Sequence, residues 1–238
     1  RIKTSLYAQG RPNPSGTLEG DVIVYGRGDP TINARLHGGS IYQALDPLVG
    51  ALTNASVKRI AGDVVADESY FRGPPFGSGW VWDDMENYYG AEISALTIND
   101  NTLQIRVKPG PGAGAPCRLS LHPATPWLTL SNRTTTVEKG GERIIHLYHP
   151  LCRNVIYVSG QMPVGEADYT DDVTVHNPAG LFAWFLHQAL ARAGIQVAGN
   201  ARSVNWLDRE AQPVDYGKLV APATAVTEAT DALTCGNE

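Results

Sequence analysis

Apolar residues recur at helical spacing in two parts of the chain. In 41–54 they occupy positions 41, 44, 45, 48 and 52, which predicts a helix with a kink or restart at Pro47. In 178–193 a second apolar stripe follows the helix-starting pair Asn177-Pro178, and Gly194 stands where a helix-terminating glycine belongs. The pattern therefore predicts two helices, and the second has capping residues at both ends.

Runs rich in Val and Ile predict strands around these helices. One strand is predicted at 18–25 and another at 57–67, and an alternating run at 98–108 predicts a third. The segments that follow the two helices have similar sequences, Ile60-Ala61-Gly62-Asp63-Val64 after the first and Val197-Ala198-Gly199-Asn200-Ala201 after the second. These two helix-to-strand units predict the halves of one α+β domain whose helices cover a common sheet.

Between the two halves the helical period disappears. A Pro- and Gly-rich linker at 111–116 precedes five short β-type runs, at 118–122, 127–130, 134–138, 143–148 and 154–158. The residues Lys139-Gly140-Gly141-Glu142 have the composition of a hairpin turn between the third and fourth of these runs.

The domain organisation expected from these patterns is an α+β domain interrupted by a small all-β domain. Its first half spans 1–111, the inserted β-rich domain 112–172 and the second half 173–215. The Ala- and Thr-rich end of the chain lacks a core period, so 216–238 is expected to be an irregular tail that frays from Ala221 onward.

Composition narrows the class of protein. The 238 residues are 42% hydrophobic and 18% charged, which is enough to bury a core and to fill two domains. A net charge of -5 without a Lys/Arg cluster argues against a nucleic-acid partner. The sequence shows neither a signal peptide nor an apolar run of the roughly 18 residues that a transmembrane helix needs.

The three cysteines, Cys117, Cys152 and Cys235, do not have the spacing of metal ligands, and no metal site or other cofactor is expected. Cys117 and Cys152 flank a run of predicted strands. They could form a disulfide across a sheet in an oxidising compartment, or they could be two buried thiols, and the sequence leaves both readings open.

The sequence contains no complete set of catalytic motifs. There is no G-x-S-x-G elbow and no S-x-x-K pair, so no catalytic residue is assigned. Ser203-x-Asn205 imitates a motif of penicillin-recognising enzymes, but it falls on a predicted strand and is interpreted as coincidence. His146 and His149 are three apart on a predicted strand, hence on opposite faces, and are expected to be surface or hairpin residues.

Two short segments suggest binding. Gly26-Arg27-Gly28-Asp29-Pro30 contains half a phosphate-binding turn and an adhesion tripeptide, but the missing third glycine and the stiff proline favour a simple turn. The stretch 79–90 places acidic residues among aromatic ones, a combination that suits recognition of a cationic, partly apolar group. The alternative for this stretch is the aromatic edge of a core with a solvated acidic turn.

Several ordered motifs across about 1–215 resemble one protein family. They are the segments 20–31 and 60–67, the residues Gly79-Trp80-x-Trp82-Asp83-Asp84, and Ser94-Ala95-Leu96 with Asn99 and Asn101. Together they resemble the D-alanyl-D-alanine carboxypeptidases/endopeptidases of the DacB type, the low-molecular-mass class C penicillin-binding proteins. In that family a penicillin-binding catalytic domain is interrupted by two inserted domains, one α+β and one β-rich, and this chain resembles the insertion alone.

The resemblance implies a role without chemistry of its own. The family's S-x-x-K, S-x-N and K-T-G motifs have no counterparts here, so the chain is expected to be the accessory part of an exported enzyme of the periplasm or cell envelope. Its partners would be the missing catalytic domain and, through it, the peptidoglycan stem peptide. Asp84 matches an acidic residue that meets the side-chain amino group of the stem peptide, and Tyr89 matches an aromatic beside it. The alternative is a free-standing cell-envelope binding or scaffold module.

Overall fold

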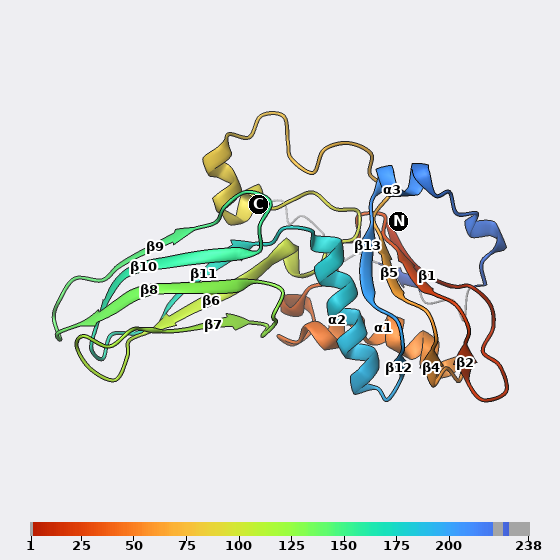
Figure 1. Cartoon of the computed structure of the whole chain (residues 1–238), viewed down its shortest axis with the longest axis horizontal. Coiled ribbons are helices and arrows are strands. Elements are labelled where there is room, and N and C mark those ends of the chain that lie inside the picture. The colour runs from red at the N-terminus through yellow and green to blue at the C-terminus, as the bar shows by residue number, and fades with distance from the viewer. Residues whose placement is uncertain (1, 221–225, 229–238) are drawn as a thin grey trace, which may run out of the picture. The chain divides into compact units, whose positions relative to one another are not determined.

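The structure is a computed structural model that describes residues 2–220 and 226–228, apart from the side chains of Trp82, Glu86 and 226–228 (Figure 1). The chain has an α+β fold and forms two compact units. Unit 1 contains the described residues up to Pro75, then Ile93–Asp100, and the described residues from Asn177 onward. Unit 2 contains Phe76–Glu92 and Asn101–His176.

Unit 1 is built on a five-stranded sheet with the order β13-β5-β3-β1-β14. The central strands β3, β5 and β13 are parallel, whereas β1 pairs antiparallel with β3 and with β14. A second sheet has the order β12-β4-β2 and consists of two-residue strands. Along the chain, β2, β4 and β12 come directly before β3, β5 and β13. The bounds are β1 Lys3–Ala8, β2 Thr17–Leu18, β3 Val22–Tyr25, β4 Arg59–Ile60, β5 Val64–Asp67, β12 Gln196–Val197, β13 Ala201–Val204 and β14 Val226–Glu228.

The two predicted helices are confirmed. Helix α1 (Ile41–Asn54) begins after Ser40, whose side chain accepts a hydrogen bond from the backbone of Gln43, and it runs through Pro47 without the predicted restart. Helix α2 (Pro178–Arg192) begins after Asn177, which caps Gly180, and Gly194 follows it with φ +81°. Helix α2 packs on β5 and β13 and against α1, so the two halves share one sheet as predicted (Figure 1).

The core of unit 1 lies between these helices and the sheet. Their apolar stripes supply side chains that are almost completely buried, including Leu45, Leu48, Phe182 and Phe185. Burial of such side chains is worth about 1.5–3 kcal/mol each and is the main reason why these amphipathic segments become helices here.

Two of the predicted strands are interrupted. The run 18–25 forms β2 and β3 with a break at Gly20-Asp21, and 57–67 forms β4 and β5 with a break at Gly62-Asp63. At both breaks the chain leaves the small sheet and enters the large one, and the aspartate binds the next strand through its side chain.

Unit 2 contains two three-stranded sheets, in the orders β8-β10-β9 and β11-β6-β7. Its core includes Ile105, Ile156, Val158 and Met162, each fully buried. The bounds are β6 Thr102–Lys108, β7 Arg118–His122, β8 Thr129–Val137, β9 Ile144–Tyr148, β10 Val155–Pro163 and β11 Tyr169–Thr174.

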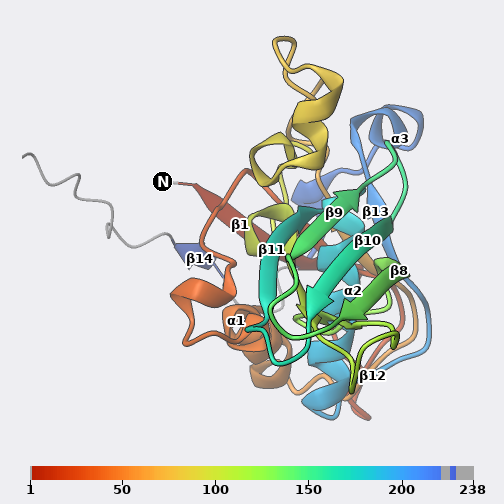
Figure 2. The same ribbon diagram turned by 90° about the vertical axis from the view of Figure 1, so that its left-hand side faces the viewer.

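The predicted hairpin through Lys139-Gly140-Gly141-Glu142 is wrong. Strands β8 and β9 flank this turn but do not pair with each other, because β10 lies between them (Figure 2). Strand β10 is parallel to β8 and antiparallel to β9. The long register of β10 with β8, from Val155 opposite Thr129 to Pro163 opposite Val137, outweighs the local turn signal.

Short helical turns complete the described elements. Segment 76–92 of unit 2 contains two of them, η2 (Trp82–Glu86) and η3 (Tyr88–Gly90). Unit 1 contains the six-residue helix α3, and η4 crosses from unit 1 into unit 2. The bounds of the others are η1 Ala34–Leu36, η4 Asn99–Asn101, α3 Trp206–Ala211 and η5 Tyr216–Lys218.

The domain limits expected from the sequence, 1–111, 112–172, 173–215 and 216–238, stay a prediction, since compact units and domains need not share boundaries. Of the expected tail, Val226–Glu228 forms β14. Residues 221–225 and 229–238, with Cys235, lie outside the described part of the chain.

Candidate functional site

The candidate site is the segment 76–92 of unit 2, which carries Asp84 and Tyr89. This segment holds four acidic residues and no Lys or Arg. Several of its large side chains are exposed: 56% for Val81, 66% for Tyr88 and 54% for Tyr89. An acidic, aromatic and accessible surface of this kind attracts a cation rather than an anion.

The structure brings Asp84 and Tyr89 together. The Tyr89 hydroxyl donates to Oδ1 of Asp84 at 3.4 Å, and Oδ2 of the same carboxylate accepts from the backbone N–H of Val81 at 3.0 Å. Desolvation and the nearby Asp84 carboxylate raise the pKa of Tyr89, so the phenol stays protonated and remains a donor. The carboxylate is thus held at both oxygens and keeps lone pairs for a ligand.

The backbone around Asp84 is tightly folded. The N–H of Asn87 donates to the carbonyl of Asp84 at 3.0 Å, and the N–H of Gly90 donates to Asn87 at 2.9 Å. Gly90 is buried, and a Cβ atom at this position would lie 2.1 Å from the carbonyl oxygen of Asp84. The sequence therefore needs glycine at 90 for the two 3₁₀ turns to pack on each other.

Three contacts attach this loop to the rest of unit 2. The Thr174 hydroxyl donates to the carbonyl of Met85 at 3.2 Å, and the Asn101 side chain donates to the carbonyl of Glu92 at 2.9 Å. Nδ1 of His176 lies 2.5 Å from Oε1 of Glu92. The hydrogen bond to Glu92 raises the pKa of His176, which favours the charged pair.

Sequence reasoning missed these supporting residues. His149 was expected to be a surface or hairpin residue on a strand, but it lies partly buried just beyond β9, and its ring bonds Thr174 and the backbone of Arg153. Thr174 and His176 lie at and just beyond the end of β11, whereas His149 follows β9, and no motif or spacing in the sequence joins them to Met85 or Glu92.

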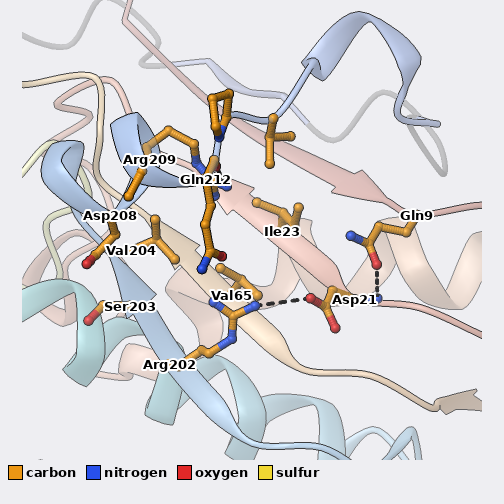
Figure 3. A pocket seen from close by; sticks show the side chains of 13 residues that line it. Gln9, Asp21, Ile23, Val65, Arg202, Ser203, Val204, Asp208, Arg209 and Gln212 are labelled. Atoms are coloured by element: carbon orange, nitrogen blue, oxygen red, sulfur yellow. Dashed lines mark hydrogen bonds and ion pairs between the residues drawn. The ribbon is translucent and has the colours of Figure 1, made fainter.

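A separate polar pocket lies in unit 1, with a volume of about 600 Å³ (Figure 3). Its charges are largely neutralised, since Arg202 bonds Asp21 at 3.1 Å and Asp63 at 2.7 Å, and Arg209 is paired with the buried Asp67. Asp208 also lines the pocket, and its carboxylate accepts from the backbone N–H of Asn205, so the pocket offers polar surface that does not point to one ligand class.

The motif-like segments of the sequence have structural roles. Ser203 lies on β13, and Asn205 caps α3 by accepting hydrogen bonds from the backbone of Leu207 and Asp208. Asp29 of the adhesion tripeptide is 2% exposed and accepts from both the backbone and the hydroxyl of Thr31, so it cannot reach a receptor. These observations support the interpretation of both segments as incidental matches.

Cys117 and Cys152 are free thiols, and Cys117 is buried whereas Cys152 is exposed. The disulfide reading of these two residues is therefore not supported, and the reading of two buried thiols holds for Cys117 alone. Among the residues that the structure describes, no group of three His, Cys, Asp or Glu side chains could hold a metal ion. None of the described helices combines the length and the apolar character that crossing a bilayer requires.

Comparison with known proteins places the chain in a class of peptidases. The chain matches the D-Ala-D-Ala carboxypeptidase 3 (S13) family over residues 1–214. It belongs to this family, and the resemblance identified from the sequence motifs is confirmed.

Similar proteins agree with this assignment. The chain is 29% identical over 218 residues to a D-alanyl-D-alanine carboxypeptidase of Actinomadura sp. (strain R39), which covers 87% of this chain and 38% of that protein. It is 31% identical over 101 residues to the D-alanyl-D-alanine carboxypeptidase DacB of Haemophilus influenzae, or 42% of this chain and 19% of that protein.

The fold is similar to that of a solved structure, penicillin binding protein 4 (dacB) from Haemophilus influenzae. The TM-score is 0.71 at 20% sequence identity, over 94% of this chain and 46% of that one. The same protein complexed with a β-lactam gives a TM-score of 0.60 at 16% identity, over 94% of this chain and 43% of that one. The chain thus spans less than half the length of the relatives it matches.

Proposed function

We propose that this chain forms accessory, non-catalytic domains of an exported serine D-Ala-D-Ala carboxypeptidase or endopeptidase of the cell envelope. The chain shapes the rim of the active-site cleft, and a penicillin-binding catalytic domain supplies the acylation chemistry. The support for this role is that the chain belongs to the family yet contains no S-x-x-K or K-T-G sequence, so it lacks the activated serine that acyl transfer needs.

The observation that carries a role in substrate binding is the geometry of Asp84. Its carboxylate is held by Val81 and Tyr89 on a loop without cationic residues. We assign it as the group that binds the side-chain amino group of the peptidoglycan stem peptide, with Tyr89 orienting it. An ammonium–carboxylate hydrogen bond at such a site is worth roughly 1.5–3 kcal/mol, or about a 10- to 150-fold preference.

The test uses the enzyme in which these residues accompany a catalytic domain. Asp84→Asn is expected to reduce kcat/KM about 10-fold or more for a donor peptide with a free side-chain amine, while a donor with that amine acetylated is unaffected. The matched control is Asp83→Asn, which removes the neighbouring exposed carboxylate. An unchanged preference in Asp84→Asn means that this carboxylate does not select the amine.

The accessory role has its own test. A fluorescent penicillin is expected to leave no covalent adduct on the purified 238-residue chain. An adduct would show that the chain contains a reactive hydroxyl and would overturn the proposal. Measurable affinity of the isolated chain for stem peptides would instead favour a free-standing binding module.

A further inference from the structure

Thr174 lies at the end of β11 and is 3% exposed. Its hydroxyl donates to the carbonyl of Met85, the residue directly after Asp84. This partly buried hydrogen bond holds the backbone of η2, and the position of the Asp84 carboxylate depends on that backbone. Thr174 is therefore well placed to position the loop without touching a ligand.

The Thr174 hydroxyl has a second partner, His149. Nδ1 of His149 lies 3.1 Å from Oγ1 of Thr174, and Nε2 lies 2.5 Å from the carbonyl oxygen of Arg153. A carbonyl accepts hydrogen bonds and cannot donate, so Nε2 carries a proton. In the neutral ring Nδ1 is then an acceptor, and its donor is the Thr174 hydroxyl.

The proton count gives two arrangements. The Thr174 hydroxyl has one proton, so with neutral His149 it can serve either Nδ1 or the carbonyl of Met85, but not both. With protonated His149, Nδ1–H donates to Oγ1 of Thr174, and the hydroxyl proton is free to bond Met85. All three hydrogen bonds are satisfied together in this second arrangement alone.

The surroundings of His149 are partly buried and contain charged groups. A cavity of about 20 Å³, room for roughly one water molecule, is lined by His149, Cys152, Glu92 and His176 among other residues. Burial lowers the pKa of His149, opposed by the Arg153 carbonyl and the Glu92 carboxylate, and the charge of His176 lowers it further. Since the pKa of His176 is raised, the two histidines titrate apart and His176 is charged first as the pH falls.

We propose that Thr174 and His149 are positioning residues for the loop that carries Asp84, and that protonation of His149 completes the tether from Thr174 to Met85. The specificity part of this inference rests on the proposed function of Asp84, whereas the tether itself does not. Acidification then orders the loop, and the acidic surface presented to a cationic group becomes better defined.

The tether is tested on the 238-residue chain by hydrogen exchange. Protection factors of the Asn87 and Gly90 amides, corrected for intrinsic rates, are expected to rise as the pH falls below about 6.5, because burial lowers the pKa of His149 from that ordinary value. In Thr174→Val the rise is expected to disappear, with exchange about three- to tenfold faster at the acidic end. Amides of β7 serve as the internal reference in the same experiment.

Two further variants distinguish the tether from a general packing effect. Thr174→Ser keeps the hydroxyl and is expected to keep the pH response, even if Thr174→Val folds poorly. His149→Gln keeps a donor for Arg153 but does not titrate, so its loop protection is expected to be independent of pH. A pH response that survives in His149→Gln, or is absent from the unaltered chain, overturns the proposal.

The consequence for specificity is measured in the enzyme with its catalytic domain. Thr174→Val is expected to lower the preference for amine-bearing over acetylated donors, and Thr174→Ser to restore it. If Asp84→Asn leaves that preference unchanged while the exchange data follow the prediction, the tether stands and the proposed role of Asp84 fails. If exchange in Thr174→Val matches the unaltered chain, the tether is wrong whatever Asp84 does.

Discussion

Oδ1 of Asp21 accepts a hydrogen bond from the backbone N–H of Asp63 at 2.8 Å, across 42 residues of sequence. Asp63 repeats the contact one strand further on, where its Oδ1 accepts from the N–H of Asn200 at 2.8 Å. On the other side, the side chain of Gln9 accepts from the N–H of Asp21 at 3.0 Å (Figure 3). A ladder of side chain to backbone bonds thus crosses the beginnings of the parallel strands β3, β5 and β13.

Arg202 joins two steps of this ladder. Its guanidinium donates to Oδ2 of Asp63 at 2.7 Å and to Oδ2 of Asp21 at 3.1 Å. Each aspartate therefore uses one oxygen for a strand backbone and the other for the arginine. The contacts occupy the polar groups that are exposed where each strand leaves the small sheet for the large one.

Removal of the Asp63 carboxylate is expected to destabilise unit 1 in a pH-dependent way. The Asn200 backbone and Arg202 lower the pKa of Asp63 in the folded state. The stability it provides is then full above its unfolded pKa of about 3.9 and is lost as the pH falls through the lower folded pKa. We expect Asp63→Ala to cost roughly 1–2 kcal/mol at neutral pH and progressively less below about pH 4.

Urea unfolding followed by the amide NMR signals of β3 and β5 measures this difference for unit 1 alone. Asp46→Asn removes an exposed carboxylate of α1 and is the control, with no comparable change expected. A cost that is the same at about pH 3 and about pH 7 would show that ionisation of Asp63 does not contribute.

The glycines before the ladder residues provide a second prediction. A Cβ at Gly62 would lie 2.3 Å from Oδ1 of Asp21 and 2.6 Å from the backbone carbon of Gly20, so Gly62→Ala forces neighbouring strands apart. We expect a loss of about 1–3 kcal/mol in the unfolding free energy of unit 1. Gly50 lies inside α1 with nothing within 4 Å of a Cβ, and Gly50→Ala is expected to stabilise by roughly 0.5–1 kcal/mol.

Thermal unfolding of the two variants side by side tests steric contact against glycine flexibility. If both variants lower the unfolding midpoint, a backbone conformation specific to the turn does not explain the loss at Gly62, because Gly50 lies in a helix and would show the same loss. If Gly62→Ala is neutral, the close approach between the strands is not a constraint on this fold.

The ladder also shows what the sequence could and could not predict. The similar sequences around Gly62-Asp63 and Gly199-Asn200 correctly predicted equivalent positions in one sheet, because local sequence patterns repeat where the local structure repeats. Both helices were predictable from apolar spacing, and the second also from its caps, because these signals lie within a few residues of each other. The breaks within two predicted strands were not, because they depend on contacts between Asp21, Asp63 and Asn200.

Pairing between distant strands was the least predictable feature. The hairpin expected at Gly140-Gly141 has the right local composition, but strand order is decided by burial of whole faces in three dimensions. The support of the Asp84 loop was missed for the same reason, since Glu92, Thr174 and His176 meet only in the folded unit. The pairing of Asp84 with substrate amine stays a prediction.

Asp67, which is fully buried, is expected to be the most sensitive carboxylate of unit 1. It accepts from the Ser69 backbone, from Nε and Nη2 of Arg209 at 2.8 and 2.5 Å, and from the Tyr216 hydroxyl. Burial and Asp67 raise the pKa of Tyr216, which keeps that donor protonated. We expect Asp67→Ala to cost about 3–5 kcal/mol, because it leaves the mostly buried guanidinium of Arg209 without its charge partner.

A double-mutant cycle checks the cause. Asp67→Ala combined with Arg209→Met removes both charges and is expected to be less destabilised than Asp67→Ala alone. Tyr216→Phe, which deletes one donor, is expected to cost only about 1 kcal/mol. Additive costs in the double variant would mean that the unpaired guanidinium is not the source of the instability.

The pair formed by Glu92 and His176 is expected to stabilise unit 2 below neutral pH. The hydrogen bond with Glu92 raises the pKa of His176 above its unfolded value of about 6.5. A raised pKa means that the folded state binds more protons, so this contribution is full below about pH 6.5 and is lost as the pH rises through the folded pKa. Glu92→Gln is therefore expected to destabilise more at about pH 5.5 than at about pH 8.5, by roughly 1 kcal/mol because the histidine is partly exposed.

Urea unfolding followed by amide signals of β10 gives the free energy, and the ring signals of His176 give its pKa directly. Glu166→Gln alters an exposed carboxylate of the same unit and is expected to leave both unchanged. In Glu92→Gln the pKa of His176 is expected to fall toward about 6.5. A pKa that stays raised would mean that Glu92 is not its cause, and the pH-dependent stability assigned to this pair would then be wrong.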